Sequence, residues 1–199
     1  GKAVRNELNR RFKQWKQALL DAPAPARAAA DESAGGHRTV ADMATELTPT
    51  SGRRGSRKAD VVRLTLGLPG EDDEVPPPWP TQGEVAQRLG ITQGPVSQHY
   101  RAVVKTWAEL EWFTALRDEL VDVLSGAGRV MTAHELAAAL RARHGTGAGD
   151  TPERAAARAL AVVRAAVDTE VWDGQQEDNP SGGPRLAVAR RGEHLLIAL

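Results

Sequence analysis

Hydrophobic and polar positions alternate with a helical period along most of the chain. In residues 2–20, apolar side chains recur at steps of three and four, at Val4, Leu8, Phe12, Trp15 and Leu19. This spacing predicts an amphipathic helix over residues 1–20, with basic residues on its remaining faces. Residues 21–38 begin with "DAPAPARAAADESAGG", whose prolines and glycines are typical of a linker.

One short pattern recurs at three later points of the chain. It comprises threonine, two residues, an acid, an apolar residue, alanine, two residues and leucine, and it occurs as "TVADMATEL" from Thr39, "TQGEVAQRL" from Thr81 and "TAHELAAAL" from Thr132. A threonine before a helix can accept from the third helical amide, while the acid at that third position accepts from the threonine amide. The pattern therefore predicts three capped helices of the kind that opens a helix-turn-helix.

Further elements follow from the same reading. We expect a helix that ends near Gly67, one from Gln93 to about Trp107, one that ends near Gly126, and one from Pro152 to about Asp168. "RVM" should be a short strand, and "RLAVA" and "HLLIAL" should form a hairpin. A helix, a short strand, two helices and a hairpin in this order are typical of a winged helix-turn-helix.

The predicted fold is therefore mainly α, with tandem helix-turn-helix units of which the C-terminal one is winged by a small β-hairpin. We divide the chain into an amphipathic helix (1–20), a linker (21–38), a short helix with a basic linker (39–56), a central helix-turn-helix (57–115) and a winged helix-turn-helix (116–199).

The central unit fits the helix-turn-helix pattern at several positions. Ala86 is small enough for close helix packing, Gly90 can adopt the left-handed conformation of the turn, and Thr92 should cap the second helix. Val85, Leu89, Ile91 and Val96 occupy the apolar positions. His99 stands where an aliphatic residue is usually buried, so either Tyr100 packs in its place or the helix is rotated.

The second helix of this unit carries side chains suited to DNA. Glutamine can bind adenine in a bidentate manner, serine can donate or accept, and arginine and lysine bind guanine or phosphate. The candidate DNA-binding residues are Gln93, Ser97, Gln98, Arg101 and Lys105, with Arg53, Arg54, Arg57 and Lys58 nearby in the sequence. Gly94 and Pro95 weaken this interpretation, because they place no base-reading side chain at the N-terminal end of the helix that would enter a groove of DNA. The alternative is that these side chains form only the polar outer face of a packed helix.

The composition narrows the possible functions. The 26 basic and 26 acidic residues cancel, so nucleic acid would have to bind at local patches. Without cysteine, disulfides, a thiol nucleophile and cysteine-based metal sites are excluded, and the scattered histidines lack metal-binding spacing, so we expect no metal and no cofactor. No apolar run approaches the roughly 20 residues of a membrane span. We expect a cytoplasmic bacterial protein, or a piece of one, that does not contact a membrane.

Two resemblances to known families extend this reading. "RKADVVRLTLGL" followed by "TQGEVAQRLGITQGPVSQHY" resembles region 4 of bacterial sigma factors. "WPTQGEVAQRLGITQGPVSQ" followed by "LRDELVDVLSGAGRVMTAHELAAALRARHG" resembles the region after the kinase domain in PglW-type serine/threonine kinases of phage growth limitation and type 2 BREX defence, over residues 57–199. The chain lacks the Gly-rich loop, the His-Arg-Asp loop and the Asp-Phe-Gly motif of a kinase, so we do not expect an enzyme.

The resemblance implies a role beside a kinase that lies elsewhere in the parent protein. Our first hypothesis is a non-catalytic module that binds duplex DNA through the central helix-turn-helix. The alternatives are a scaffold that docks the kinase domain or other defence proteins, and a sigma-like transcription regulator. Ser56 follows two arginines in "RRGS", the form that basophilic kinases favour, and is a possible phosphosite. The C-terminal helix "PERAAARALAVVRAAVD" has few base-reading side chains and should serve packing or protein contact.

Overall fold

Threonine capping boxes start three helices. In the computed structural model, α2 (Val40–Glu46), α4 (Gln82–Leu89) and α7 (Ala133–His144) follow Thr39, Thr81 and Thr132, and each reciprocal box is complete. The Thr81 amide, for example, donates to Glu84 Oε2 at 2.6 Å. Because hydrogen bonds from Thr39 and Thr81 favour the charged carboxylates, the pKa values of Asp42 and Glu84 are lowered. The prediction of three helices capped by threonine is thus confirmed.

The structure describes residues 38–49, 56–70, 75–175, 183–192 and 194–199, which belong to one compact unit spanning His37–Leu199. The helix predicted over residues 1–20 and nearly all of the linker after it lie outside the described residues. The remaining elements are α3 (Arg57–Leu66), α5 (Gln93–Ala108), α6 (Glu111–Gly126), α8 (Pro152–Asp173), β1 (Val130–Thr132), β2 (Ala187–Arg191) and β3 (His194–Ala198).

A small antiparallel sheet completes the C-terminal part. Its strand order is β1-β3-β2, and Ile197 in the central strand pairs with Met131 on one side and Val188 on the other. Ile197 is fully buried and Met131 is half-buried, so the β1–β3 part of this row packs toward the helices, whereas Val188 is exposed. The prediction of a mainly α fold with a small β wing is confirmed.

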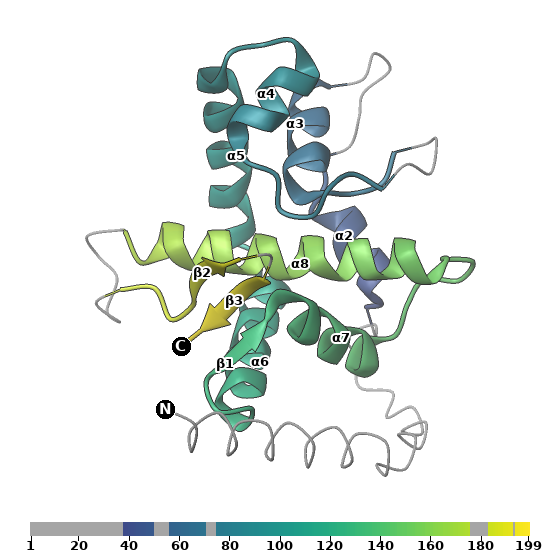
Figure 1. Cartoon of the computed structure of the whole chain (residues 1–199), viewed down its shortest axis with the longest axis vertical. Helices are drawn as coiled ribbons and strands as arrows, with labels where there is room; N and C mark the ends of the chain where they lie inside the picture. The colour runs from purple at the N-terminus through teal and green to yellow at the C-terminus, as the bar shows by residue number, and fades with distance from the viewer. Residues whose placement is uncertain (1–37, 50–55, 71–74, 176–182, 193) are drawn as a thin grey trace. The chain divides into compact units, whose positions relative to one another are not determined.

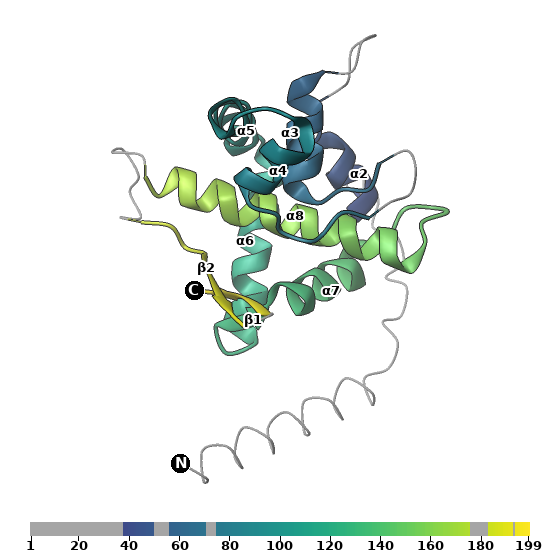
Figure 2. The same ribbon diagram turned by 45° about the horizontal axis from the view of Figure 1, so that its top comes forward.

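Helix α8 lies at the centre of the described unit. Figures 1 and 2 show it crossing between α2, α3 and α5 on one side and α6, α7 and the sheet on the other, and it contacts each of these helices. Every residue from Ala159 to Val167 is buried. Alanine and valine predominate in this stretch because their small side chains allow several helices to approach one axis closely.

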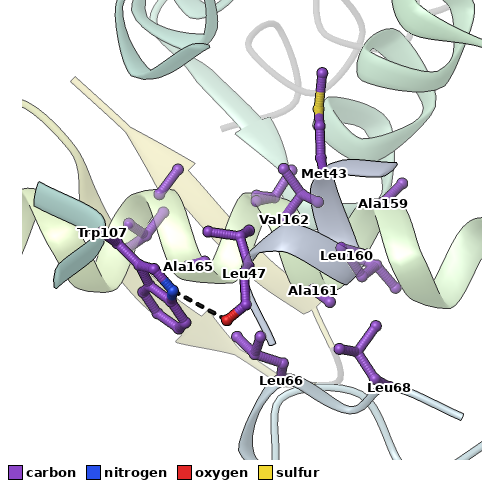
Figure 3. Packing of buried hydrophobic residues seen from close by; sticks show 14 of the residues in the cluster. Met43, Leu47, Leu66, Leu68, Trp107, Ala159, Leu160, Ala161, Val162 and Ala165 are labelled. Atoms are coloured by element: carbon purple, nitrogen blue, oxygen red, sulfur yellow. Dashed lines mark hydrogen bonds between the residues drawn. The ribbon is translucent and has the colours of Figure 1, made fainter. Parts of the chain in front are cut away.

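Residues from both predicted helix-turn-helix units share this core. Leu47, Leu66 and Leu68 belong to the same buried cluster as Leu160 of α8 (Figure 3), and the Trp107 indole N–H donates to the Leu47 carbonyl at 3.0 Å. The indole thus provides a donor for the Leu47 carbonyl, one of the acceptors left without an intrahelical partner at the C-terminal end of α2. Residues on the two sides of position 115 therefore contribute to a single core.

A buried ion network holds the last turns of α8, which runs five residues beyond the predicted end near Asp168. Arg117 of α6 donates to Glu170 at 3.1 Å and also to Asp173. Arg185 binds Glu170 through Nη2 at 2.5 Å and Nε at 3.1 Å. Burial alone would raise the pKa of Glu170, but the hydrogen bonds and charge of Arg185, with the charge of Arg117, outweigh it and lower that pKa. These partners, remote in sequence, stabilise the extra helical turn.

Candidate nucleic-acid interface

The turn between α4 and α5 has the geometry that the sequence predicts. Gly90 adopts a left-handed φ of 63°, and the Ile91 amide donates to the Ala86 carbonyl at 3.0 Å. A side chain at this φ would be strained, so glycine suits the position. Val85, Ala86 and Val96 are buried beneath the turn. The apolar positions and the glycine together fix α5 relative to α4.

Thr92 precedes α5 at the N-cap position, but its hydroxyl makes no capping hydrogen bond. The prediction that Thr92 caps the helix by its side chain is wrong in this respect. The third helical residue is Pro95, which has no backbone N–H to donate to the hydroxyl. The first turn of α5 therefore lacks the reciprocal cap that starts α4.

Tyr100 takes the packing position beside His99. Tyr100 is buried and His99 is half-buried, so the first of the two sequence alternatives holds. The Tyr100 hydroxyl donates to Asp168 Oδ2 at 2.7 Å, and Arg164 Nε lies 3.4 Å from the same oxygen. Burial raises the pKa of both Tyr100 and Asp168. This bond ties α5 directly to α8.

The predicted base-reading side chains share the outer face of α5. Gln93, Gln98, Arg101 and Lys105 are exposed, and Ser97 is half-buried. All but Gln93 line an open depression of about 530 Å³ between α5 and the end of α8, whose lining residues are Gly94, Ser97, Gln98, Arg101, Ala102, Lys105 and Trp172. We call it the α5 groove. The structure thus brings four of the five α5 candidates into one concave surface.

A smaller depression of about 260 Å³ adjoins the α5 groove and shares Ser97, Arg101 and Trp172 with it. Gln82 of α4 and Gln175 beyond α8 also line it. Sequence reasoning missed Gln82, Trp172 and Gln175. The two C-terminal residues lie after the predicted end of α8, and only the contacts of that helix reveal which face they occupy.

Of the other predicted residues, those that the structure describes do not line the α5 groove. Arg57 and Lys58 stand in the first turn of α3 and line neither depression. Arg53 and Arg54 lie outside the described residues. Ser56, the possible phosphosite, is half-buried at the N-cap of α3, and its side chain makes no capping hydrogen bond.

The C-terminal unit does not present its own third helix. The middle of α8 is covered by α2, α3 and α5, so the face that would enter a groove of DNA is occupied by protein. Arg190 and Arg191 of the hairpin are exposed. The charge of Arg190 contributes to the lowered pKa of Glu84, after the hydrogen bonds from Thr81, so this end of the hairpin lies near the start of α4.

Over residues 38–49, 56–70, 75–175, 183–192 and 194–199, no group of three or more histidine, aspartate or glutamate residues could hold a metal ion. Within that described part of the chain, none of the helices combines the length and apolar character needed to cross a membrane.

Fold and surface together define a mainly α-helical unit with a β wing and one exposed helix face bearing amides and cations. The chain is similar to "Probable kinase PglW" of Streptomyces coelicolor, with 34% identity over 206 residues. The similarity covers 85% of this chain but only 13% of that protein, and it confirms the resemblance to PglW-type kinases seen in the sequence. No family model matches the chain. No solved structure matches it either.

Proposed function

We propose that this chain is a non-catalytic, DNA-binding part of a PglW-type serine/threonine kinase of bacterial phage defence. The observation that carries the proposal is the gathering of Ser97, Gln98, Arg101 and Lys105 along the α5 groove. Duplex DNA would lie on the outer face of α5. Gln98 would contact base edges, and Arg101 and Lys105 would contact the phosphate backbone.

The fold of the C-terminal unit supports this assignment of roles. Because α8 is covered, the exposed polar face of α5 is the better placed of the two predicted recognition helices to contact DNA. The relative is named a kinase, and this chain corresponds to 13% of it. We therefore place catalysis elsewhere in the parent protein, with this part supplying recognition.

A salt-dependent gel shift on random duplex DNA tests the proposal. The affinity should fall steeply between about 50 and 200 mM salt, as counterion release requires. The double variant Gln98→Ala/Arg101→Ala should lose binding. Arg143→Ala is the matched control, because it also removes one positive charge but lies on α7 outside the groove. If the chain does not bind random duplex DNA at 50 mM salt, the proposal is wrong.

A protein-docking role is the second candidate, and the apolar part of the α5 groove favours it. Ala102 and Trp172 line the groove beside the polar groups, and the chain has no net charge. A scaffold of this kind would retain the kinase domain or another defence protein at high salt. A sigma-like regulator, the third candidate, would instead bind one promoter sequence far above random duplex.

We also propose Ser56 as a site of phosphorylation by the parent kinase. Its hydroxyl is not used for capping, and a phosphate at the N-cap of α3 would be favoured by the helix dipole. Mass spectrometry of the full-length protein, purified and incubated with ATP, should detect the phosphopeptide. An unmodified Ser56 would end this proposal.

A further inference from the structure

Trp172 is the aromatic residue that links the two depressions beside α5. It is half-buried on the last turn of α8 and lines both the α5 groove and the adjoining depression. Asp168, Val171 and Gln175 line the smaller depression with it. The spacing of Asp168, Val171 and Trp172 places these three on one face of α8, and Gln175 follows the end of the helix. This face is turned toward α5.

The position of Trp172 is fixed from two sides. Glu170 and Asp173 are held by Arg117, so the last turn of α8 is anchored to α6. On the side toward α5, Asp168 accepts the hydroxyl hydrogen of Tyr100. The wall that Trp172 forms is therefore preorganised rather than assembled when a ligand arrives, which lowers the cost of binding.

The rest of the groove has complementary chemistry. Arg101 and Lys105 are exposed cations on the facing helix, and Gln98 adds an amide with both donors and an acceptor. Among the described residues that line the α5 groove there is no acidic side chain. Asp168, at the edge of the smaller depression, is already bound by Tyr100 and Arg164. The α5 groove therefore combines cations, an amide and an aromatic ring, which suits an anionic ligand that has an aromatic part.

We propose that the α5 groove holds an unpaired nucleotide of a DNA strand, with its base stacked on Trp172, its phosphates at Arg101 and Lys105, and its base edge at Gln98. Tryptophan stacking on bases and cations along the backbone are the usual means of binding single strands. The groove, at about 530 Å³, lies within the usual range of ligand pockets, roughly 300–1,000 Å³. The inference rests on the proposed function and specifies the form of its ligand.

An intact duplex cannot make this stacking contact. Both faces of a paired base are covered by neighbouring pairs, and a side chain reaches such a face only when the base leaves the stack. Phosphate contacts, by contrast, are available on both forms of DNA. Trp172 should therefore discriminate single-stranded from duplex DNA, whereas Arg101 and Lys105 should serve both.

The test compares two fluorescent probes on the whole chain at 50 mM salt, a 12-nucleotide oligo(dT) and a blunt random duplex. Trp172→Leu keeps an apolar side chain but removes the aromatic face. Because stacking contributes substantially per base, this variant should weaken oligo(dT) binding about tenfold. Its duplex affinity should stay within about twofold of the unmodified chain, and Trp172→Phe should recover most of the oligo(dT) affinity.

Trp112→Phe is the matched control, since Trp112 is half-buried on α6 and lines neither depression. Circular dichroism shows whether each variant is folded, and Trp172→Gln, which also removes the aromatic face from this half-buried position, carries the comparison if Trp172→Leu is not folded. If the Trp172 variant loses affinity equally for both probes, or loses affinity for neither, the stacking role is overturned. Duplex binding without oligo(dT) binding overturns this inference alone, whereas binding of neither probe overturns the proposed function as well.

Discussion

Glu170 is the residue on which the buried ion network depends. It is 4% exposed and accepts from both Arg117 and Arg185, so Glu170→Gln would leave two guanidinium groups without their shared anion. Removing one partner of a buried pair costs about 3–5 kcal/mol, and we expect a loss of about that size in the free energy of unfolding. Urea denaturation at pH 7 measures it. Asp122→Asn, an exposed acid on the same helix as Arg117, should change stability by less than about 0.5 kcal/mol.

The same substitution should change how stability depends on pH. The pKa of Glu170 is lowered in the folded chain from its ordinary value of 4.5, so its contribution is present above that value. It is lost as the pH falls from about 4.5 through the lower folded pKa. Thermal unfolding between pH 3 and 7 measures this dependence. As the pH falls, the unfolding temperature of Glu170→Gln should decrease less steeply than that of the unmodified chain. An unchanged slope would mean that other carboxylates carry the acid dependence.

Single residues were the least predictable part of the molecule. The four candidates Ser97, Gln98, Arg101 and Lys105 share a helix, and helical spacing suffices to place them on one face. Trp172 belongs to a different element, so its place beside them depends on how α8 packs. The sequence does contain the reason why Thr92 makes no capping hydrogen bond. Pro95, at the third helical position, has no backbone N–H to donate to the Thr92 hydroxyl.

At the scale of elements, two glycines near the start of α5 offer a matched pair. Gly90 has a φ of 63°, whereas Gly94 lies within α5, and a Cβ at either would meet no atom within 4 Å. Gly90→Ala should therefore destabilise the chain by about 1 kcal/mol through backbone strain alone. Gly94→Ala should stabilise it by about 0.5 kcal/mol, because alanine loses less conformational freedom in a helix.

Urea denaturation of both glycine variants, at one pH and temperature, checks the opposite signs. If Gly90→Ala leaves the free energy of unfolding unchanged, the left-handed turn is not essential to the packing of α4 on α5.

Local signals account for most of the elements that the sequence predicts correctly. The capping boxes at Thr39, Thr81 and Thr132 each lie within four residues, and Gly67 and Gly90 mark the ends of α3 and α4. The end of α8 could not be placed in this way. Its last turns are stabilised by Arg117 and Arg185, which come from other parts of the chain, so no local pattern marks them.

At the scale of the whole molecule, α8 joins units that the sequence divides at residue 115. Because the core is continuous through α8, heating should unfold residues 38–199 in one cooperative transition. Differential scanning calorimetry measures this through the ratio of calorimetric to van't Hoff enthalpy, which should be close to one. Two separate transitions would show that the central and C-terminal units fold independently.

The covered position of α8 also determines which backbone amides can reach solvent. The amides of Ala159–Val167 are hydrogen-bonded within a helix whose side chains are buried along this stretch, so they should exchange with deuterium only through global opening. Amides in the first turn of α5 lack a side-chain cap and should exchange much sooner. The helix that we propose to bind DNA would then retain freedom to adjust in its first turn, while its middle, at Tyr100, is held on α8 by Asp168.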